Sequence, residues 1–133
     1  MRFSESERAL LDQPAFAQLA TVMPDGAPQN TPIWYRRDGD TLRMACRDTA
    51  RKARNIMRDP RVAVVVVDPA NPYAFVQVMG RAEIVANDAL AREEFRILAQ
   101  RYMGTDGDAW FAALPAEARF VVLLIRPERT STA

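Results

Sequence analysis

The feature that most constrains the fold of this chain is a series of short β-prone segments separated by turn residues. Asp38-Gly39 lies between two such segments and is typical of a hairpin, and Pro24-Asp25-Gly26 has the composition of a turn. We expect six strands, at residues 16–23, 29–37, 41–46, 62–67, 73–85 and 120–125. Strands joined mostly by hairpins and interrupted by short helices predict an α+β fold that is mainly β, with an antiparallel sheet closing into a barrel. At 133 residues, 1–133 is expected to form one domain.

Two of these strands carry a further signal. The run from Val62 to Val67 is β-branched almost throughout, which predicts a strand buried on both faces. Gly80 interrupts the long segment 73–85 and indicates a bulge or bend. Arg126-Pro127 is expected to end the last strand.

Four helices are expected between the strands. Ser4 and Glu7 have capping-box spacing and open a helix that ends near residue 12. A second helix should run from about 50 to 58. Asp88 is the expected N-cap of a helix over 89–102, which Gly104 ends, and a short helix follows at 108–114.

The charge of the chain is concentrated in one segment. Residues 47–61 hold six basic and two acidic residues, a net charge of +4, whereas the whole chain has a formal charge of +1. Arg51 and Lys52 fall in the first turn of the expected helix, where the macrodipole favours anions rather than cations. A bound anion would compensate, because free helix N–H groups and basic side chains can hold it together. The alternative interpretation is a solvated, charged helix face.

The composition excludes several kinds of site. The chain has no histidine, which rules out Ser-His-Asp and Cys-His catalysis and histidine-ligated metals. Cys46 is the only cysteine, so neither an internal disulfide nor a cysteine-cluster metal site can form. We expect no metal and no catalytic side chain, and a bound organic cofactor as the source of any difficult chemistry.

Composition also sets expectations for location and partners. No apolar run approaches the roughly 20 residues of a membrane helix, and residues 1–7 lack a signal-peptide core, so a cytoplasmic protein without membrane contact is expected. Nucleic acid is not expected as a partner, because the basic segment is compact and aromatic residues are not interleaved with it.

Several segments resemble one known family. Residues 19–22, the turn at 24–26 and the run 28–35 (Pro-Gln-Asn-Thr-Pro-Ile-Trp-Tyr) look like the opening of the pyridoxamine 5'-phosphate oxidase-like split barrels. Residues 49–56 resemble the phosphate-binding motif of that superfamily. Residues 58–62 and 68–73 are similar to its flavin/deazaflavin oxidoreductase branch, which mostly uses coenzyme F420. The resemblance covers about residues 4–127.

This resemblance implies a homodimer of six-stranded antiparallel split β-barrels with cofactor sites at the dimer interface. It implies that the cofactor phosphate is held by Thr49, Arg51, Lys52 and Asn55. It places Gln29, Asn30, Thr31 and Pro32 along the ring, with Met44 on a neighbouring strand and Gln77 near the ring or the ribityl chain. The alternative for 29–31 is an exposed strand face. Trp34 and Tyr35 are interpreted as core or dimer-interface residues, with the interface favoured.

The function implied is that of an F420-dependent oxidoreductase that transfers a hydride to a small, electron-poor organic acceptor. Two alternatives stay open: an FMN-dependent oxidoreductase of the same fold, and a flavin or tetrapyrrole carrier without turnover. Oxidation of vitamin B6 is disfavoured, because the oxidases of the family use histidine to grip their substrate and this chain has none.

Overall fold

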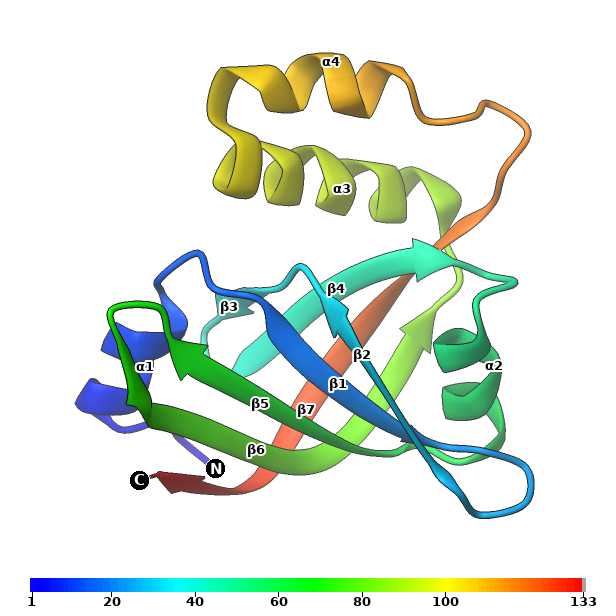
Figure 1. Ribbon diagram of the computed structural model, residues 1–133. Coiled ribbons are helices and arrows are strands. Elements are labelled where there is room, and N and C mark those ends of the chain that lie inside the picture. Colours follow the sequence, from blue (N-terminus) through cyan, green and yellow to red (C-terminus); the bar gives the residue numbers. More distant parts are fainter. Residues whose placement is uncertain (133) are drawn as a thin grey trace.

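The structure, a computed structural model, describes residues 1–132 and consists of one curled sheet with helices around it (Figure 1). The strands are β1 (Ala17–Val22), β2 (Pro28–Ile33), β3 (Arg36–Asp38), β4 (Thr41–Arg47), β5 (Arg61–Asp68), β6 (Asn71–Val85) and β7 (Phe120–Thr132). The helices are α1 (Glu5–Leu11), α2 (Arg51–Arg58), α3 (Asp88–Met103) and α4 (Gly107–Ala112), with a short 3-10 turn, η1 (Gly104–Asp106), before α4.

The strands form a single antiparallel sheet in the order β2-β1-β5-β6-β7-β4-β3. The sheet curls on itself, but its outer strands β2 and β3 do not pair, so the barrel is split along one side. The predicted fold class, an α+β protein built on an antiparallel split barrel, is confirmed.

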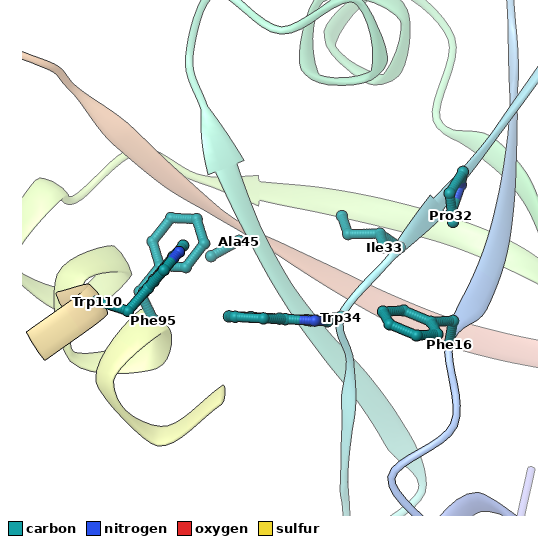
Figure 2. A pocket seen from close by; sticks show the side chains of 7 residues that line it. All are labelled: Phe16, Pro32, Ile33, Trp34, Ala45, Phe95 and Trp110. Carbon is teal, nitrogen blue, oxygen red and sulfur yellow. The ribbon is translucent and has the colours of Figure 1, made fainter. Parts of the chain in front are cut away.

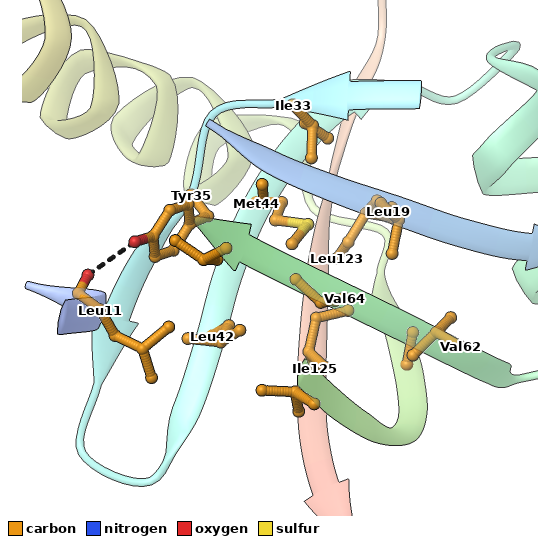
Figure 3. Close-up of a cluster of buried hydrophobic side chains, with 14 of the residues drawn as sticks. Leu11, Leu19, Ile33, Tyr35, Leu42, Met44, Val62, Val64, Leu123 and Ile125 are labelled. Carbon is orange, nitrogen blue, oxygen red and sulfur yellow. Dashed lines mark hydrogen bonds between the residues drawn. The ribbon is translucent and has the colours of Figure 1, made fainter. Parts of the chain in front are cut away.

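The inward-facing side chains of the strands make the main core (Figure 3). Side chains alternate between the two faces of a strand, and every second residue of β5, Val62, Val64 and Val66, is buried inside the barrel. Tyr35 closes this core beside α1, where its hydroxyl donates to the carbonyl oxygen of Leu11 at 2.8 Å.

Gly80 allows β6 to bend sharply over β7. The register of the two strands shifts between Met79 and Gly80, as expected of a bulge. A Cβ atom on Gly80 would lie 2.2 Å from the backbone oxygen of Arg126, so only glycine fits this crossing. The predicted bulge is confirmed. Strand β7 continues past this point to Thr132, whereas we expected it to end at Arg126-Pro127.

The helices lie at three sites around the barrel. Helices α1 and α2 flank opposite ends of it, and α3 and α4 stack as a hairpin above β4 (Figure 1). None of the helices within residues 1–132 has the length and apolar character needed to span a bilayer.

Three further expectations differ from the structure. The predicted strand 29–37 is two strands, β2 and β3, because the chain turns at Trp34 and Tyr35, and the sheet therefore has seven strands instead of six. The valine run is not buried on both faces, since Ala63 and Val65 are half-buried and Val67 is exposed within this chain. The N-cap of α3 is Asn87, whose side-chain oxygen accepts from the N–H of Leu90, and not Asp88.

Candidate functional site

Helix α2 begins without the usual device for satisfying its first N–H groups. Its N-cap is Ala50, which has no side chain able to accept a hydrogen bond, and its first turn contains no acidic residue. The first N–H groups of a helix have no intrahelical partner and carry the positive end of the helix dipole. Arg51 and Lys52 add two positive charges at the same end. This end of α2 is therefore suited to an anion.

Lys52 is the half-buried member of the basic segment. Burial lowers the pKa of its ammonium group below the usual range, and the nearby Cys46 opposes that shift. Burial also raises the pKa of the Cys46 thiol to about 11, despite the lysine. Within residues 1–132, Lys52 has no carboxylate partner. A half-buried cation without a counter-charge is costly, and an anionic ligand would offset that cost.

The other predicted phosphate residues differ in exposure. Thr49 and Arg51 are exposed beside the start of α2, as a phosphate contact requires. Asn55 is fully buried: its Nδ2 donates to Thr21 Oγ1 at 3.0 Å and lies 3.5 Å from Gln29 Oε1. Asn55 therefore ties α2 to strands β1 and β2. Its Oδ1 is buried without a partner among the described residues.

The predicted ring residues of β2 fall on two faces of an edge strand. In the β1–β2 register, Gln29 and Thr31 lie opposite inward-facing residues of β1, so both face the barrel interior. Asn30 and Pro32 alternate with them and are exposed. The hydroxyl of Thr31 is buried and has no hydrogen-bond partner within residues 1–132. An unpaired buried hydroxyl is costly and marks a place where a ligand or water can bond.

The second side of the split is the end of β4. Strand β3 pairs with β4 only from Thr41 to Arg43, so the following residues of β4 have β7 as their one strand neighbour in the described chain. This free edge and the free edge of β2 bound the split. Met44 is fully buried in the core, and Ala45, one residue later, faces the outside of the split. Met44 therefore faces the core and Ala45 faces the split, and a place for Met44 near a cofactor ring stays a prediction.

An apolar pocket of about 290 Å³ lies between the split and the α3–α4 hairpin (Figure 2). Its lining consists of aromatic and aliphatic side chains from four parts of the chain: Phe16, Pro32, Ile33, Trp34, Ala45, Phe95 and Trp110. None of these side chains is ionisable. The end of β4 carries residues of both regions: Ala45 lines the pocket on one face of the strand, and the next residue, Cys46, lies on the other face near Lys52.

The aromatic residues around this pocket form one continuous row. Trp34 stacks on Tyr102 with parallel rings 5.2 Å apart, and Trp110 lies 4.9 Å from Trp34 at a tilt of 53°. Phe16 continues the row beyond Tyr102, and Phe95 beyond Trp110. Of the two expected roles, core or interface, Tyr35 has the core role, since it is fully buried. Trp34 lines the pocket, and an interface role for it stays a prediction.

Helix α3 is fixed to the barrel by polar contacts. The buried carboxylate of Glu94 accepts two hydrogen bonds from Arg36, at 2.5 and 3.0 Å. Arg101 donates to three backbone oxygens in the segment before β1, the nearest at 2.7 Å. Tyr102 donates to the carbonyl oxygen of Ala15 at 2.6 Å. Helix α4 packs mainly on α3 and η1, and its Trp110 also contacts Trp34 directly.

Gln77 lies away from the other predicted residues. It is on the outer face of β6, opposite Val65 of β5, and its Oε1 accepts a hydrogen bond from Ser131 at 3.0 Å. That outer face belongs to the long side of the sheet, whereas Lys52 and the pocket lie at the split.

Sequence reasoning missed the residues that α3 and α4 supply. Phe95 and Trp110 fall within the helices expected at 89–102 and 108–114, and the sequence alone gives neither residue a role at a site. Phe95 and Trp110 come close to Trp34 only because of the way the α3–α4 hairpin crosses the sheet, and no local sequence pattern predicts that crossing.

Comparisons with known proteins agree with this fold. The family described as pyridoxamine 5'-phosphate oxidase matches residues 3–133. The solved structure of an F420 reductase is 36% identical to this chain and superposes on it with a TM-score of 0.82. The match covers 97% of this chain and 98% of that one. A conserved protein of Mycobacterium tuberculosis is 26% identical with a TM-score of 0.76, the match covering 98% of this chain and 84% of that one.

A curated enzyme matches a shorter segment. The 5a,11a-dehydrotetracycline/5a,11a-dehydrooxytetracycline reductase of Streptomyces rimosus is 36% identical over 72 residues. The match spans 51% of this chain and 51% of the reductase, so about half of each protein is compared.

Proposed function

The chain belongs to the pyridoxamine 5'-phosphate oxidase family, and from this premise we propose that it is an F420-dependent reductase of a small, electron-poor organic acceptor. Similarity to an F420 reductase and to a dehydrotetracycline reductase supports an oxidoreductase of this fold. When bound, the reduced deazaflavin supplies the hydride. The protein then has to bind, orient and shield the reactants, which needs no histidine.

The observation that carries this proposal is the basic, uncapped start of α2. Thr49, Arg51 and Lys52 offer a hydroxyl and two cations there, and the first N–H groups of α2 are free to join them. A phosphate diester is the kind of group that such a set of donors binds, each charge-assisted bond contributing roughly 1.5–3 kcal/mol. Asn55 is assigned a positioning role, since it has no exposed surface and anchors α2 to β1 and β2.

The ring of the cofactor would be held along the split. Asn30 and Pro32 are exposed on the edge strand, and Thr31 offers the unpaired hydroxyl described above. Met44 supports this surface from the core, one residue before Ala45. The walls of the pocket are apolar, and the proton that accompanies the hydride comes from solvent, because the lining contains no acidic or basic side chain.

We also propose a homodimer. The outer face of β1, β5 and β6 is largely apolar and uncovered within this chain; it consists of Gln18, Ala20, Ala63, Val65, Val67, Phe75, Gln77 and Met79. A second copy on this face would bury the exposed half of the valine run, and would bring Gln77 into a site shared by two subunits. Such an interface should exceed about 1,000 Å². A monomeric mass by light scattering, with cofactor present, would contradict it.

Parallel titrations of the purified protein with F420 and with FMN, at fixed salt, test which cofactor it binds. The quenching of cofactor fluorescence measures binding in each titration. We expect tighter binding of F420, since the chain resembles an F420 reductase over nearly its whole length and its exposed Arg54 is free to meet an acidic tail. Equal or tighter binding of FMN would favour the FMN-dependent alternative. A protein that binds reduced F420 but never reoxidises it with any acceptor would be a carrier.

A further inference from the structure

The pocket above the split has a lining that is selective in chemical terms. All seven of its side chains are apolar or aromatic, and the carboxylate of Glu94 on α3, the nearest acidic residue in sequence to Phe95, is turned away and bound by Arg36. A charged group that entered this pocket would lose part of its hydration without gaining an ion-pair partner, which disfavours its entry. The occupant should therefore carry no charge on the part that enters.

The orientation of the rings selects for shape. Tyr102 covers one face of the Trp34 ring and does not line the pocket, so the opposite face of Trp34 is the one presented to it. Trp110 is tilted by 53° from Trp34, so that the two indoles border a wedge instead of stacking on each other (Figure 2). Aromatic rings prefer offset-stacked or edge-to-face neighbours, and a flat ring in this wedge can make both contacts at once.

We propose that this pocket binds the acceptor as a flat, uncharged conjugated ring system, and that Trp110 is the residue that sets this specificity. The proposal rests on the proposed function, since an acceptor is required only if the protein is a reductase. Trp34 forms one wall and is held by its stacking on Tyr102, in the connection between β2 and β3. Trp110 forms the other wall and is carried by α4, which packs mainly on α3 and η1.

Gly107 determines where Trp110 stands. A Cβ atom at Gly107 would lie 2.5 Å from the backbone oxygen of Ala99, so any larger residue must push α4 away from α3. Trp110 is three residues later, about one turn along α4, and would move with the helix. We therefore assign Gly107 as a positioning residue for Trp110.

The experiment measures ring binding separately from turnover. Three probes share one skeleton: naphthamide is flat and neutral, naphthoate is flat and anionic, and decahydronaphthamide is neutral and puckered. Binding is measured by calorimetry, without cofactor and with saturating F420, to the wild-type protein and to Trp110→Leu, Trp110→Phe and Gly107→Ala. Phe111→Leu is the matched control, because Phe111 neighbours Trp110 on α4 and does not line the pocket.

We expect naphthamide to bind at least 10-fold more tightly than the other two probes. Trp110→Leu should weaken its binding about 3- to 10-fold, the loss of one aromatic contact, and Trp110→Phe should restore most of it. Gly107→Ala should resemble Trp110→Leu, and Phe111→Leu the wild type. The inference is overturned if naphthoate binds as well as naphthamide, if Trp110→Leu and Phe111→Leu are equivalent, or if F420 displaces naphthamide, since the pocket would then belong to the cofactor ring.

The same data separate this inference from the proposed function. Failure of F420 to bind, with naphthamide still selected by Trp110, would remove the reductase assignment and leave the ring specificity standing. Normal F420 binding without discrimination among the three probes would remove the ring specificity and leave the reductase assignment standing. Circular dichroism of each variant shows whether α4 has unfolded, and Trp110→Phe keeps the proposal testable if Trp110→Leu does not fold.

Discussion

Helices α1 and α2 are nearly the same length and flank opposite ends of the barrel, yet they begin in opposite ways (Figure 1). Helix α1 opens with a complete capping box: Ser4 Oγ accepts from the N–H of Glu7 at 3.1 Å, and Glu7 Oε1 accepts from the N–H of Ser4 at 2.7 Å. Its first turn is acidic, as the helix dipole favours. Helix α2 has neither a side-chain cap nor an acidic residue there.

The difference indicates what each helix is for. Every feature of the start of α1 stabilises the folded chain, whereas the start of α2 leaves N–H groups free and adds Arg51 and the half-buried Lys52. The absence of a cap at α2, in a chain that caps α1 fully, is consistent with a start of α2 that binds a ligand. The four predictions below test this contrast, from the largest expected effect to the smallest.

The largest effect is expected at the start of α2. Lys52→Ala should weaken cofactor binding roughly 10- to 100-fold, because it removes one charge-assisted phosphate contact of about 1.5–3 kcal/mol. Arg54→Ala should weaken it much less, because that side chain is exposed and a solvated charge contributes little. Titration of both variants with F420 at low and high salt measures the asymmetry. Equal losses at the two positions, with one shared salt dependence, would mean a diffuse positive patch instead of a phosphate site.

The next effect is expected at α1 and should be confined to stability. Ser4→Ala removes the capping box and should lower the free energy of unfolding by about 1 kcal/mol, measured by urea denaturation. Cofactor affinity should stay within error of the wild type, since α1 lies at the other end of the barrel. A matching loss of affinity would show that α1 and the cofactor site are coupled and would break the contrast.

Sequence reasoning succeeded where the signal was local. The capping box of α1, the bulge at Gly80 and the extent of α2 were all predicted, because each depends on neighbouring residues or on the steric limits of one residue. The resemblance supplied the split barrel. Residues 49–52 were grouped correctly at the start of one helix, although their part in binding a phosphate stays a prediction.

What failed depended on contacts between distant segments. The valine run is apolar on both faces, but the chain itself covers only one of them. The sequence also did not show which face of β4 each residue takes: neighbouring strand residues point to opposite faces, so Met44 is core and Ala45 lines the pocket. Trp110 was missed because its partner Trp34 is 76 positions away in the sequence.

A third prediction gives α2 the cap that it lacks. Ala50 has the extended conformation that an N-cap residue adopts, so Ala50→Asp can accept a hydrogen bond from the first turn without strain. The cofactor-free protein should gain about 0.5 kcal/mol in its free energy of unfolding, and F420 should bind several-fold more weakly, because the new carboxylate competes with the phosphate. Ala50→Gly is the control that adds no acceptor. A gain in stability without a loss in affinity would separate the helix N-terminus from the phosphate site.

The smallest effect concerns the pH dependence of stability and isolates Lys52. Burial lowers the pKa of this lysine in the folded protein below its ordinary value of 10.5, so the unfolded chain binds the proton more tightly in the window just below that pH. Stability then rises as the pH increases through this window, because the unfolded state holds more protons there. The effect is small because the side chain is only half-buried. The Cys46 thiol works in the opposite direction, since its pKa is raised to about 11 and stability is lost as the pH rises from 9.0 toward that value.

The measurement therefore uses Cys46→Ala as the background. Urea denaturation at neutral pH and just below pH 10.5 should show a rise in stability that the Lys52→Met variant of this background lacks. At neutral pH the Lys52→Met protein should be the more stable of the two without cofactor, and the less stable with saturating F420, because only the charged lysine gains a phosphate partner. If F420 does not reverse which of the two proteins is more stable, Lys52 does not face the ligand. The start of α2 would then differ from that of α1 only in lacking a cap.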